Sequence, residues 1–253
     1  MHIDTECNQV ATALLLAAGI GSRLRPLTEN QPKCLTEVDG ISILERLVYC
    51  LGQQGVGRLV VVVGHLEHRI REFLGEQRDG VSIEYVVNPQ YRTTNNLYSL
   101  WLARDVIHEP FLLVESDVVF QPSLLADLLQ PDRIAVSSMR LWMNGSTVTV
   151  DVFQSVRAFQ LGEDLPTEEL RYKTVNICSL SLKSWRQIIL ELERQVSEGH
   201  VNRFYESVFA EMVADGRLAF QAVFFDPGSW YEIDTPQDLD QAELLFAAGR
   251  TDR

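Results

Sequence analysis

One segment, residues 14–35, constrains this chain more than any other stretch. It opens with an apolar run, residues 13–18, which predicts a buried first strand. Gly19 and Gly21 then turn the chain tightly, and glycine lets the backbone come close to a bound group. Three cations follow within the same segment: Arg23, Arg25 and Lys33. A strand that opens into a glycine-rich turn with cations behind it predicts a phosphate-binding loop.

The loop differs from two common phosphate motifs. A P-loop consists of a glycine, four further residues and then Gly-Lys-Ser/Thr, which this segment lacks. A dinucleotide fingerprint needs a third glycine at the position where this chain has Leu24. Taken alone, two glycines at this spacing favour a structural turn over a binding loop. The longer string A-A-G-x-G-x-R, eight residues and then P-K resembles the signature loop of nucleotidyltransferases that couple an NTP to a small phosphate acceptor.

Strands alternate with helices along the chain, which predicts a doubly wound parallel sheet. Apolar runs predict interior strands at 58–64, 81–87 and 111–114, and helical spacing predicts helices at 43–54, 65–74, 121–129, 182–198 and 204–214. The resemblance implies a three-layer α/β/α, Rossmann-like mixed sheet with a small β insert, roughly 140–175, over the acceptor site. We expect a loose leader at 1–10 and a single domain at 11–248.

Two acidic residues follow strands or turns that we expect to meet at the ligand edge of the sheet. Asp117 comes just after the apolar strand 111–114, and Asp234 lies in the string E-I-D-T-P-x-D-L. Each could instead be a plain turn or helix-capping residue. The resemblance identifies both as carboxylates that hold Mg²⁺, whereas the role of Glu115, where relatives vary, stays open.

A polar cluster at residues 91–99 opens another helix. Thr94 or Asn95 could cap it, but two adjacent amides, Asn95 and Asn96, with Ser99 exceed what a cap requires. An amide carries both donor and acceptor, as reading a pyrimidine edge requires. Asn-Asn-x-Tyr-Ser-Leu resembles bacterial phosphocholine cytidylyltransferases and the related enzymes that activate aminoethylphosphonate with CTP.

The resemblance implies a set of nucleotide-binding residues. They are Leu16, Ala17, Ala18, Gly19, Gly21, Ser22, Arg23, Asn88, Asn95, Asn96 and Ser99.

The acceptor would be held by a second set of residues. Lys173 precedes an apolar strand and either binds the phosphate or phosphonate or is a solvated residue at the strand's edge. Trp142 either faces the acceptor or belongs to the core. Trp230 and Tyr231 offer aromatic faces to a quaternary ammonium, while Glu232 suits a primary ammonium. The sequence does not choose between these chemistries.

The composition of the chain limits the kinds of molecule that it is expected to bind. The chain has 253 residues and a net charge of −13, which argues against binding to nucleic acid or to an anionic membrane surface. Four scattered cysteines fit free thiols of a reducing compartment, so we expect the cytoplasm. The expected ligands are CTP and a small phosphoalcohol or phosphonate. A homodimer is one open arrangement.

The resemblance thus implies an enzyme that transfers CMP from CTP to phosphocholine, 2-aminoethylphosphonate or a hydroxylated analogue, and releases pyrophosphate. Asp117 and Asp234 would hold Mg²⁺, Arg23 would neutralise the leaving phosphates, and Lys33 would stabilise charge at the α-phosphate. One alternative is a sugar-1-phosphate nucleotidyltransferase that uses UTP, dTTP or GTP. The other is a non-catalytic nucleotide-binding module on the same fold.

Overall fold

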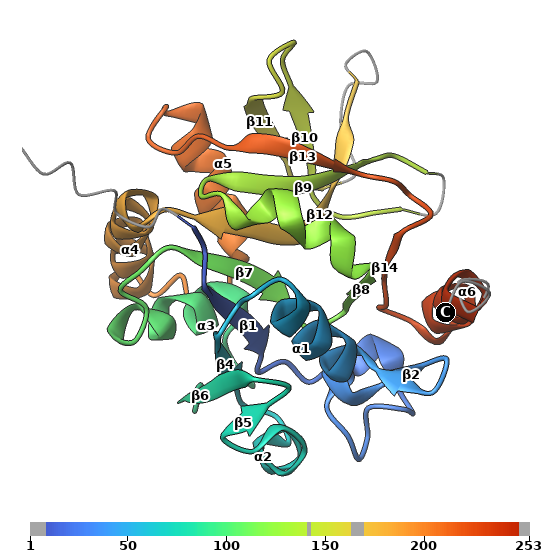
Figure 1. Cartoon of the computed structure of the whole chain (residues 1–253). Helices are drawn as coiled ribbons and strands as arrows, with labels where there is room; N and C mark the ends of the chain where they lie inside the picture. Colours follow the sequence, from blue (N-terminus) through green and yellow to red (C-terminus); the bar gives the residue numbers. More distant parts are fainter. Residues whose placement is uncertain (1–8, 141–142, 163–169, 248–253) are drawn as a thin grey trace, which may run out of the picture.

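The computed structural model describes residues 9–140, 143–162 and 170–247. In these residues a ten-stranded mixed sheet runs through the molecule, with helices on both faces (Figure 1). Along its main path the strands are β11 (Val156–Gln160), β10 (Thr147–Val150), β12 (Tyr172–Leu180), β7 (Phe111–Glu115), β1 (Thr12–Ala17), β4 (Arg58–Val63), β6 (Val81–Val87) and β5 (Gln77–Arg78). Two further strands extend it, β9 (Arg133–Ser138) beside β12 and β13 (Gln221–Phe225) beside β9.

The centre of the sheet is parallel, as the apolar runs predict. β1 pairs in parallel with both β4 and β7, and β4 pairs in parallel with β6. β12 then runs antiparallel to β7, to β9 and to β10, which makes the sheet mixed. Two small sheets lie apart from it: β8 (Val118–Phe120) with β14 (Trp230–Glu232), and β2 (Glu37–Val38) with β3 (Ile41–Ser42).

Helices pack on both faces because the central strands are apolar on both sides. They are α1 (Ile43–Gln53), α2 (Glu67–Leu74), α3 (Asn96–Leu102), α4 (Leu182–Ser197), α5 (Tyr205–Ala214) and α6 (Pro236–Ala247). Leu15 of β1 belongs to the same core cluster as Leu47 of α1, whereas Leu14 belongs to the cluster that holds Trp185 of α4. The three-layer α/β/α class predicted from the sequence is confirmed.

Some predicted elements differ in detail. Residues 122–129 form a 3₁₀ helix, η4 (Pro122–Leu129), and the helix expected from residue 65 begins at Glu67, after Leu66 in a left-handed conformation with φ 50°. Shorter 3₁₀ turns are η1 (Ser22–Leu24), η2 (Lys33–Leu35) and η3 (Ala103–Asp105). Within the range of the expected β insert, β10 and β11 pair as an antiparallel hairpin. None of the described helices has both the length and the apolar character to cross a membrane.

β12 belongs to both halves of the sheet. Its last four residues pair with β7, while its first residues pair with β10 on the same side. Its pairing with β9 shifts register between Thr174 and Cys178, where Asn176 has a φ of 59°. An irregularity of this kind re-aims a side chain, and it directs Asn176 toward the site described below.

Trp185 anchors α4 on the sheet and gives a test of this core. Its side chain is fully buried, packs edge-on against Phe111 and donates from Nε1 to the carbonyl of Ile107 at 3.1 Å. We expect Trp185→Ala to lower the free energy of unfolding by about 3–5 kcal/mol, measured by chemical denaturation. Trp185→Phe keeps most of the packing and should cost about 1–2 kcal/mol for the lost hydrogen bond. Equal losses in the two variants would contradict this description.

Candidate active site

The predicted loop and carboxylates meet at one edge of the sheet. β1 and β7 pair in parallel with Leu16 opposite Glu115, so the glycine loop after β1 lies beside Asp117, which follows β7. Asp234 arrives from β14, which pairs with β8, and the amide of Ile233 donates to the carbonyl of Asp117 at 2.8 Å. Strand pairing therefore brings together residues that are more than a hundred positions apart in the sequence.

Lys33 lies between the two aspartates. Its Nζ is 2.8 Å from Asp117 Oδ2 and 2.7 Å from Asp234 Oδ1. The guanidinium of Arg23 also donates to Asp234 Oδ1, at 2.8 Å. The side chains of Lys33, Asp117 and Asp234 are 12–13% exposed, whereas that of Arg23 is 68% exposed. Two cations thus balance two carboxylates, and Arg23 has the freedom to move toward a ligand.

Electrostatics keep Lys33 charged. Burial alone would lower the pKa of Lys33, but the carboxylates of Asp117 and Asp234 raise it above its ordinary value. Asp117 Oδ1 is buried and has no hydrogen-bond partner among the described residues. A buried carboxylate oxygen without a partner is costly, so this atom is suited to a ligand such as a metal ion.

Gly21 is required by the loop. It has a φ of 64°, and a Cβ there would lie 3.1 Å from Cβ of Lys33 and 3.3 Å from Cγ2 of Thr28. Thr28 Oγ1 in turn donates to the carbonyl of Gly21 at 2.8 Å. A Cβ at Gly19 would meet nothing within 4 Å, which leaves open space for a bound group above that backbone.

A pocket of about 280 Å³ lies over the loop. It is lined by ten of the eleven predicted nucleotide-binding residues: Leu16, Ala18, Gly19, Gly21, Ser22, Arg23, Asn88, Asn95, Asn96 and Ser99. Ala17 is not among its lining residues. Successive residues of a strand face opposite sides, and Ala17 lies in the core cluster that holds α1. The prediction for Ala17 is therefore corrected, because its side chain belongs to the other layer.

The asparagines of this pocket have protein partners. Asn95 caps α3 by accepting from the amide of Asn96. Asn96 accepts from the amide of Tyr205 at 3.0 Å and donates to Glu115 and Glu206 at 3.2 and 3.4 Å. The side chains shape the pocket in this way, and their reading of a pyrimidine edge stays a prediction.

Asn88 is similarly engaged. Its amide nitrogen donates to Ser99 Oγ at 3.0 Å and to Thr94 Oγ1 at 3.2 Å, and its oxygen accepts from the amide of Gln90. It fixes the loop that leads into α3.

A second pocket of about 450 Å³ adjoins the first. The two share six lining residues: Arg23, Asn96, Glu115, Asp117, Phe204 and Asp234. Lys173 and Glu232 line the second pocket, where Lys173 Nζ is 3.0 Å from Glu232 Oε2. Lys173 is only 1% exposed and also donates to the carbonyl of Thr174, so it is not a solvated residue at the strand's edge.

The second pocket has an acidic wall that sequence reasoning missed in part. Glu206, in the first turn of α5, lines it together with Glu115 and Glu232. Burial raises the pKa of all three carboxyl groups, and their mutual repulsion raises that of Glu115 further. Asn176, aimed by the irregularity in β12, donates to Glu232 Oε1 at 2.9 Å.

Two predicted acceptor residues lie elsewhere. Trp230 is fully buried in the core cluster with α1, and Tyr231 is 6% exposed in a smaller cluster beside α6. They do not line either pocket, so their assignment to the acceptor is wrong: alternation along β14 turns both rings into apolar layers. Trp142 lies outside the described residues.

A phosphate loop, a lysine between two carboxylates and two adjoining pockets at the carboxyl edge of a three-layer sheet define a nucleotidyltransferase type of site. A family model described as the MobA-like NTP transferase domain matches residues 13–146. The chain belongs to this family, as the resemblance of its first loop predicts.

Individual relatives indicate which members of the family this chain is similar to in sequence and fold. A CMP-5′-(3-aminopropyl)phosphonate synthase of Streptomyces rubellomurinus is 35% identical over 94% of this chain, which spans only 39% of that protein. A 2-aminoethylphosphonate cytidylyltransferase of Lancefieldella rimae is 35% identical, with 83% of this chain and 84% of the relative covered. The solved CTP:phosphocholine cytidylyltransferase of Streptococcus pneumoniae has the same fold, with a TM-score of 0.79, 22% identity, and 94% of this chain and 99% of that chain covered.

The contacts of Asn96 give a test of the wall between the pockets. Asn96→Asp keeps the acceptor for Tyr205 but places a third carboxylate beside Glu115 and Glu206. Because the pKa values of these carboxyls are raised in the folded state, stability should fall as pH rises. We expect a loss of about 1–3 kcal/mol in the free energy of unfolding at pH 8, and a smaller loss near pH 5.

Asn95→Asp is the matched control. It adds the same charge one residue away, where aspartate is an equally good helix cap. Denaturant titrations at both pH values should show little change for Asn95→Asp, and a pH-independent loss for Asn96→Asp would contradict the described wall.

Proposed function

We propose that this chain transfers CMP from CTP to the phosphonate of a small aminoalkylphosphonate and releases pyrophosphate. The observation that carries the proposal is the placement of Lys33, Asp117 and Asp234 where two pockets adjoin. Such a junction suits the transfer of a nucleotidyl group, because the α-phosphorus of a nucleotide in the first pocket would face an acceptor in the second. The names of the two relatives at 35% identity support CTP and an aminoalkylphosphonate as the substrates.

The reaction needs no protein nucleophile. An oxygen of the acceptor phosphonate is already anionic; it attacks the α-phosphorus of CTP, and the bond from the α-phosphorus to the bridging oxygen breaks as pyrophosphate leaves. Lys33 stabilises the charge that builds on the α-phosphate, and the largely exposed Arg23 neutralises the leaving phosphates.

Mg²⁺ is the proposed cofactor, and its ligands would be Asp117 and Asp234. Oxygen donors suit this ion, and the buried, unpartnered Oδ1 of Asp117 fits such a role. Among the described residues, no group of three or more His, Cys, Asp or Glu side chains is placed to hold a metal. Mg²⁺ characteristically takes one or two carboxylates plus substrate phosphates and water, and when bound it neutralises the triphosphate.

The acidic wall favours a primary ammonium in the acceptor. Glu206 and Glu232 supply the carboxylate acceptors that a primary ammonium requires for hydrogen bonding. A quaternary ammonium is held by several aromatic faces, and Phe204 is the only aromatic side chain among the described residues that line this pocket. Lys173, paired with Glu232, would direct the anionic end of the acceptor toward the junction.

Phosphocholine is the second candidate acceptor, favoured by the fold shared with the phosphocholine enzyme. A sugar 1-phosphate is a poorer candidate, since it carries no cationic group to offset the charge of the acidic wall.

Pyrophosphate release with Mg²⁺ and each of four NTPs tests the reaction. The acceptors are 2-aminoethylphosphonate, 3-aminopropylphosphonate, phosphocholine, hydroxyethylphosphonate and glucose 1-phosphate. We expect release with CTP and an aminoalkylphosphonate, and weaker release with phosphocholine. Turnover limited to glucose 1-phosphate with UTP or dTTP would replace the proposal with the sugar reaction, and no release with any pair would favour the non-catalytic module.

Lys33→Met and Asp117→Asn test the junction. Each removes a charge at the reacting centre, so we expect kcat to fall by about 10²- to 10³-fold or more. Lys183→Met is the matched control, because Lys183 is an exposed residue of α4 remote from both pockets. Near-normal turnover in Lys33→Met, with folding checked by circular dichroism, would overturn the assignment of Lys33.

A further inference from the structure

The second part of the connector between α4 and α5, residues 200–204 and here called the connector, forms part of both pockets. Phe204 lines the first and the second pocket, and Arg203 lines the second. The connector is tied to the nucleotide side through its backbone. The carbonyl of Val201 accepts from the amide of Asn95 at 3.0 Å, and the amide of Tyr205, just after the connector, donates to Asn96 at 3.0 Å.

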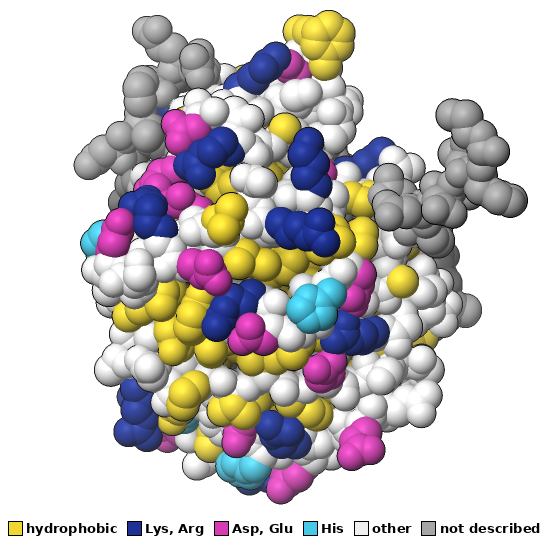
Figure 2. Space-filling view, turned by 90° about the vertical axis from the view of Figure 1, so that its left-hand side faces the viewer, with side chains coloured by type: hydrophobic (Ala, Val, Ile, Leu, Met, Phe, Trp, Pro, Cys, Tyr) yellow, Lys and Arg dark blue, Asp and Glu magenta, His cyan; other side chains and the backbone are white. Residues whose placement is uncertain are grey.

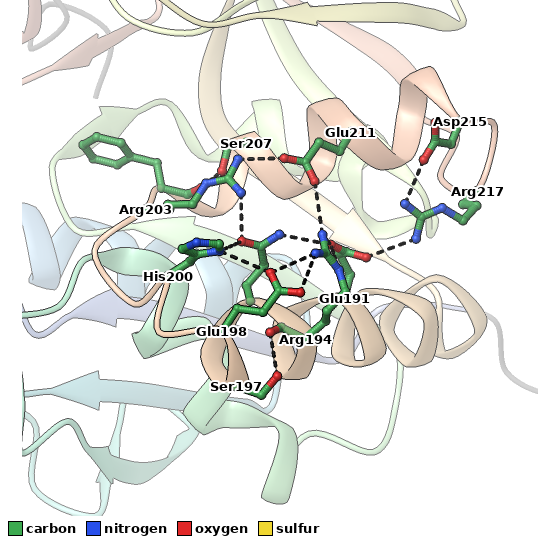
Figure 3. Close-up of polar contacts among 12 residues, drawn as sticks. Glu191, Arg194, Ser197, Glu198, His200, Arg203, Ser207, Glu211, Asp215 and Arg217 are labelled. Atoms are coloured by element: carbon green, nitrogen blue, oxygen red, sulfur yellow. Dashed lines mark hydrogen bonds and ion pairs between the residues drawn. The ribbon is translucent and has the colours of Figure 1, made fainter.

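Arg203 ties the connector to the two helices that flank it (Figure 3). Its guanidinium donates through Nη1 to Gln195 Oε1 of α4 at 2.8 Å and through Nη2 to Glu211 Oε1 of α5 at 2.7 Å. The planar fork of an arginine that meets two acceptors fixes both its position and its orientation. The residue before Phe204 is therefore held from outside the pockets.

The acceptors of Arg203 are themselves fixed. Gln195 is 1% exposed, and its amide nitrogen donates to Glu191 Oε1 at 3.2 Å. Glu191 is also buried and is bound by Arg194 and Arg217. Hydrogen bonds from Arg194 lower the pKa of Glu191, so this central carboxylate stays ionised.

Toward the surface the network becomes solvent-exposed. Asp215 pairs with Arg217 at 2.9 Å, with side chains 61% and 42% exposed, and the side chains of Glu211 and Arg203 are 40% and 36% exposed. The buried contact of Arg203 is the one to Gln195. On the face shown in Figure 2, Lys and Arg side chains are interspersed with Asp and Glu side chains. Exposed pairs contribute little, whereas the buried part of a network restrains the groups it contacts.

We propose that Gln195 and Glu211 are positioning residues that act through Arg203: they hold the connector so that Phe204 stands as the shared wall of the nucleotide and acceptor pockets. The inference rests on the proposed function for the identity of the two ligands, but not for the placement of the connector. If the connector is already fixed before a ligand binds, binding does not have to include the entropic cost of ordering it. A loosened connector should therefore weaken the binding of the acceptor. It should also reduce the effect of bound nucleotide on that binding.

Glu211→Ala is the test, because Glu211 does not line either pocket. We expect the KM for 2-aminoethylphosphonate to rise about three- to fivefold while kcat changes less than about twofold, because the pair is partly exposed and Gln195 still holds Arg203. Glu211→Gln keeps an acceptor for Arg203 and should restore most of the affinity. Asp215→Ala removes an acid from the same network without touching Arg203, and it should match the wild type.

Calorimetry adds a readout that a merely structural role would not move. A non-hydrolysable CTP analogue should tighten acceptor binding in the wild type and in Asp215→Ala, and do so much less in Glu211→Ala. Equal kinetics in Glu211→Ala and Asp215→Ala, or a fall in kcat at unchanged KM, would overturn the positioning role. If Glu211→Ala does not fold, Gln195→Met serves in its place, because it removes the other acceptor of Arg203 and Gln195 lines neither pocket.

Amide hydrogen exchange of the ligand-free protein separates this inference from the proposed function. Peptides covering residues 200–205 should exchange faster in Glu211→Ala than in the wild type, whereas Asp215→Ala should not differ. Equal exchange in all three proteins would overturn the inference even if the enzyme is active. Faster exchange in Glu211→Ala with no pyrophosphate released from any substrate pair would support the connector's placement and overturn the proposed function alone.

Discussion

The ammonium of Lys33 between Asp117 and Asp234 is the interaction on which the site depends. Two buried carboxylates facing one another repel, and a charged lysine at 2.7–2.8 Å from both removes that repulsion. Each member comes from a different part of the chain: η2 after the glycine loop, the end of β7, and the end of β14. One cation therefore fixes how the loop sits relative to two strand ends, and it does so at the point where the two pockets adjoin.

Much of this could be predicted from the sequence because the signals are local. The apolar runs that became β1, β4 and β7 are continuous, so their burial on both faces follows from composition alone. Gly21 marks a left-handed turn, and parallel strand order places the segment after β7 beside the loop after β1. Even the exclusion of Ala17 from the pocket follows from strand alternation once the strand is assigned.

The rest depends on contacts that no local pattern encodes. Glu206 looks like an ordinary acid in the first turn of a helix, and only the packing of α5 beside Asn96 brings it to the second pocket. Arg203 precedes that helix with no motif around it. The aromatic pair Trp230 and Tyr231 was assigned to the acceptor because large aromatic side chains suit a cage and a core equally well, and sequence gives no measure of depth.

The double pairing of β12 bears on how the two halves of the sheet can move relative to each other. Lys173 of the second pocket lies on a strand that is hydrogen-bonded to β10 and β9 near that residue. Farther along, the same strand is hydrogen-bonded to β7, which precedes Asp117. Rotating one half of the molecule against the other would break this ladder of backbone hydrogen bonds. The paired strands therefore resist a hinge motion between the two halves of the sheet, and they link Lys173 to the strand end beside Asp117 through continuous backbone hydrogen bonds.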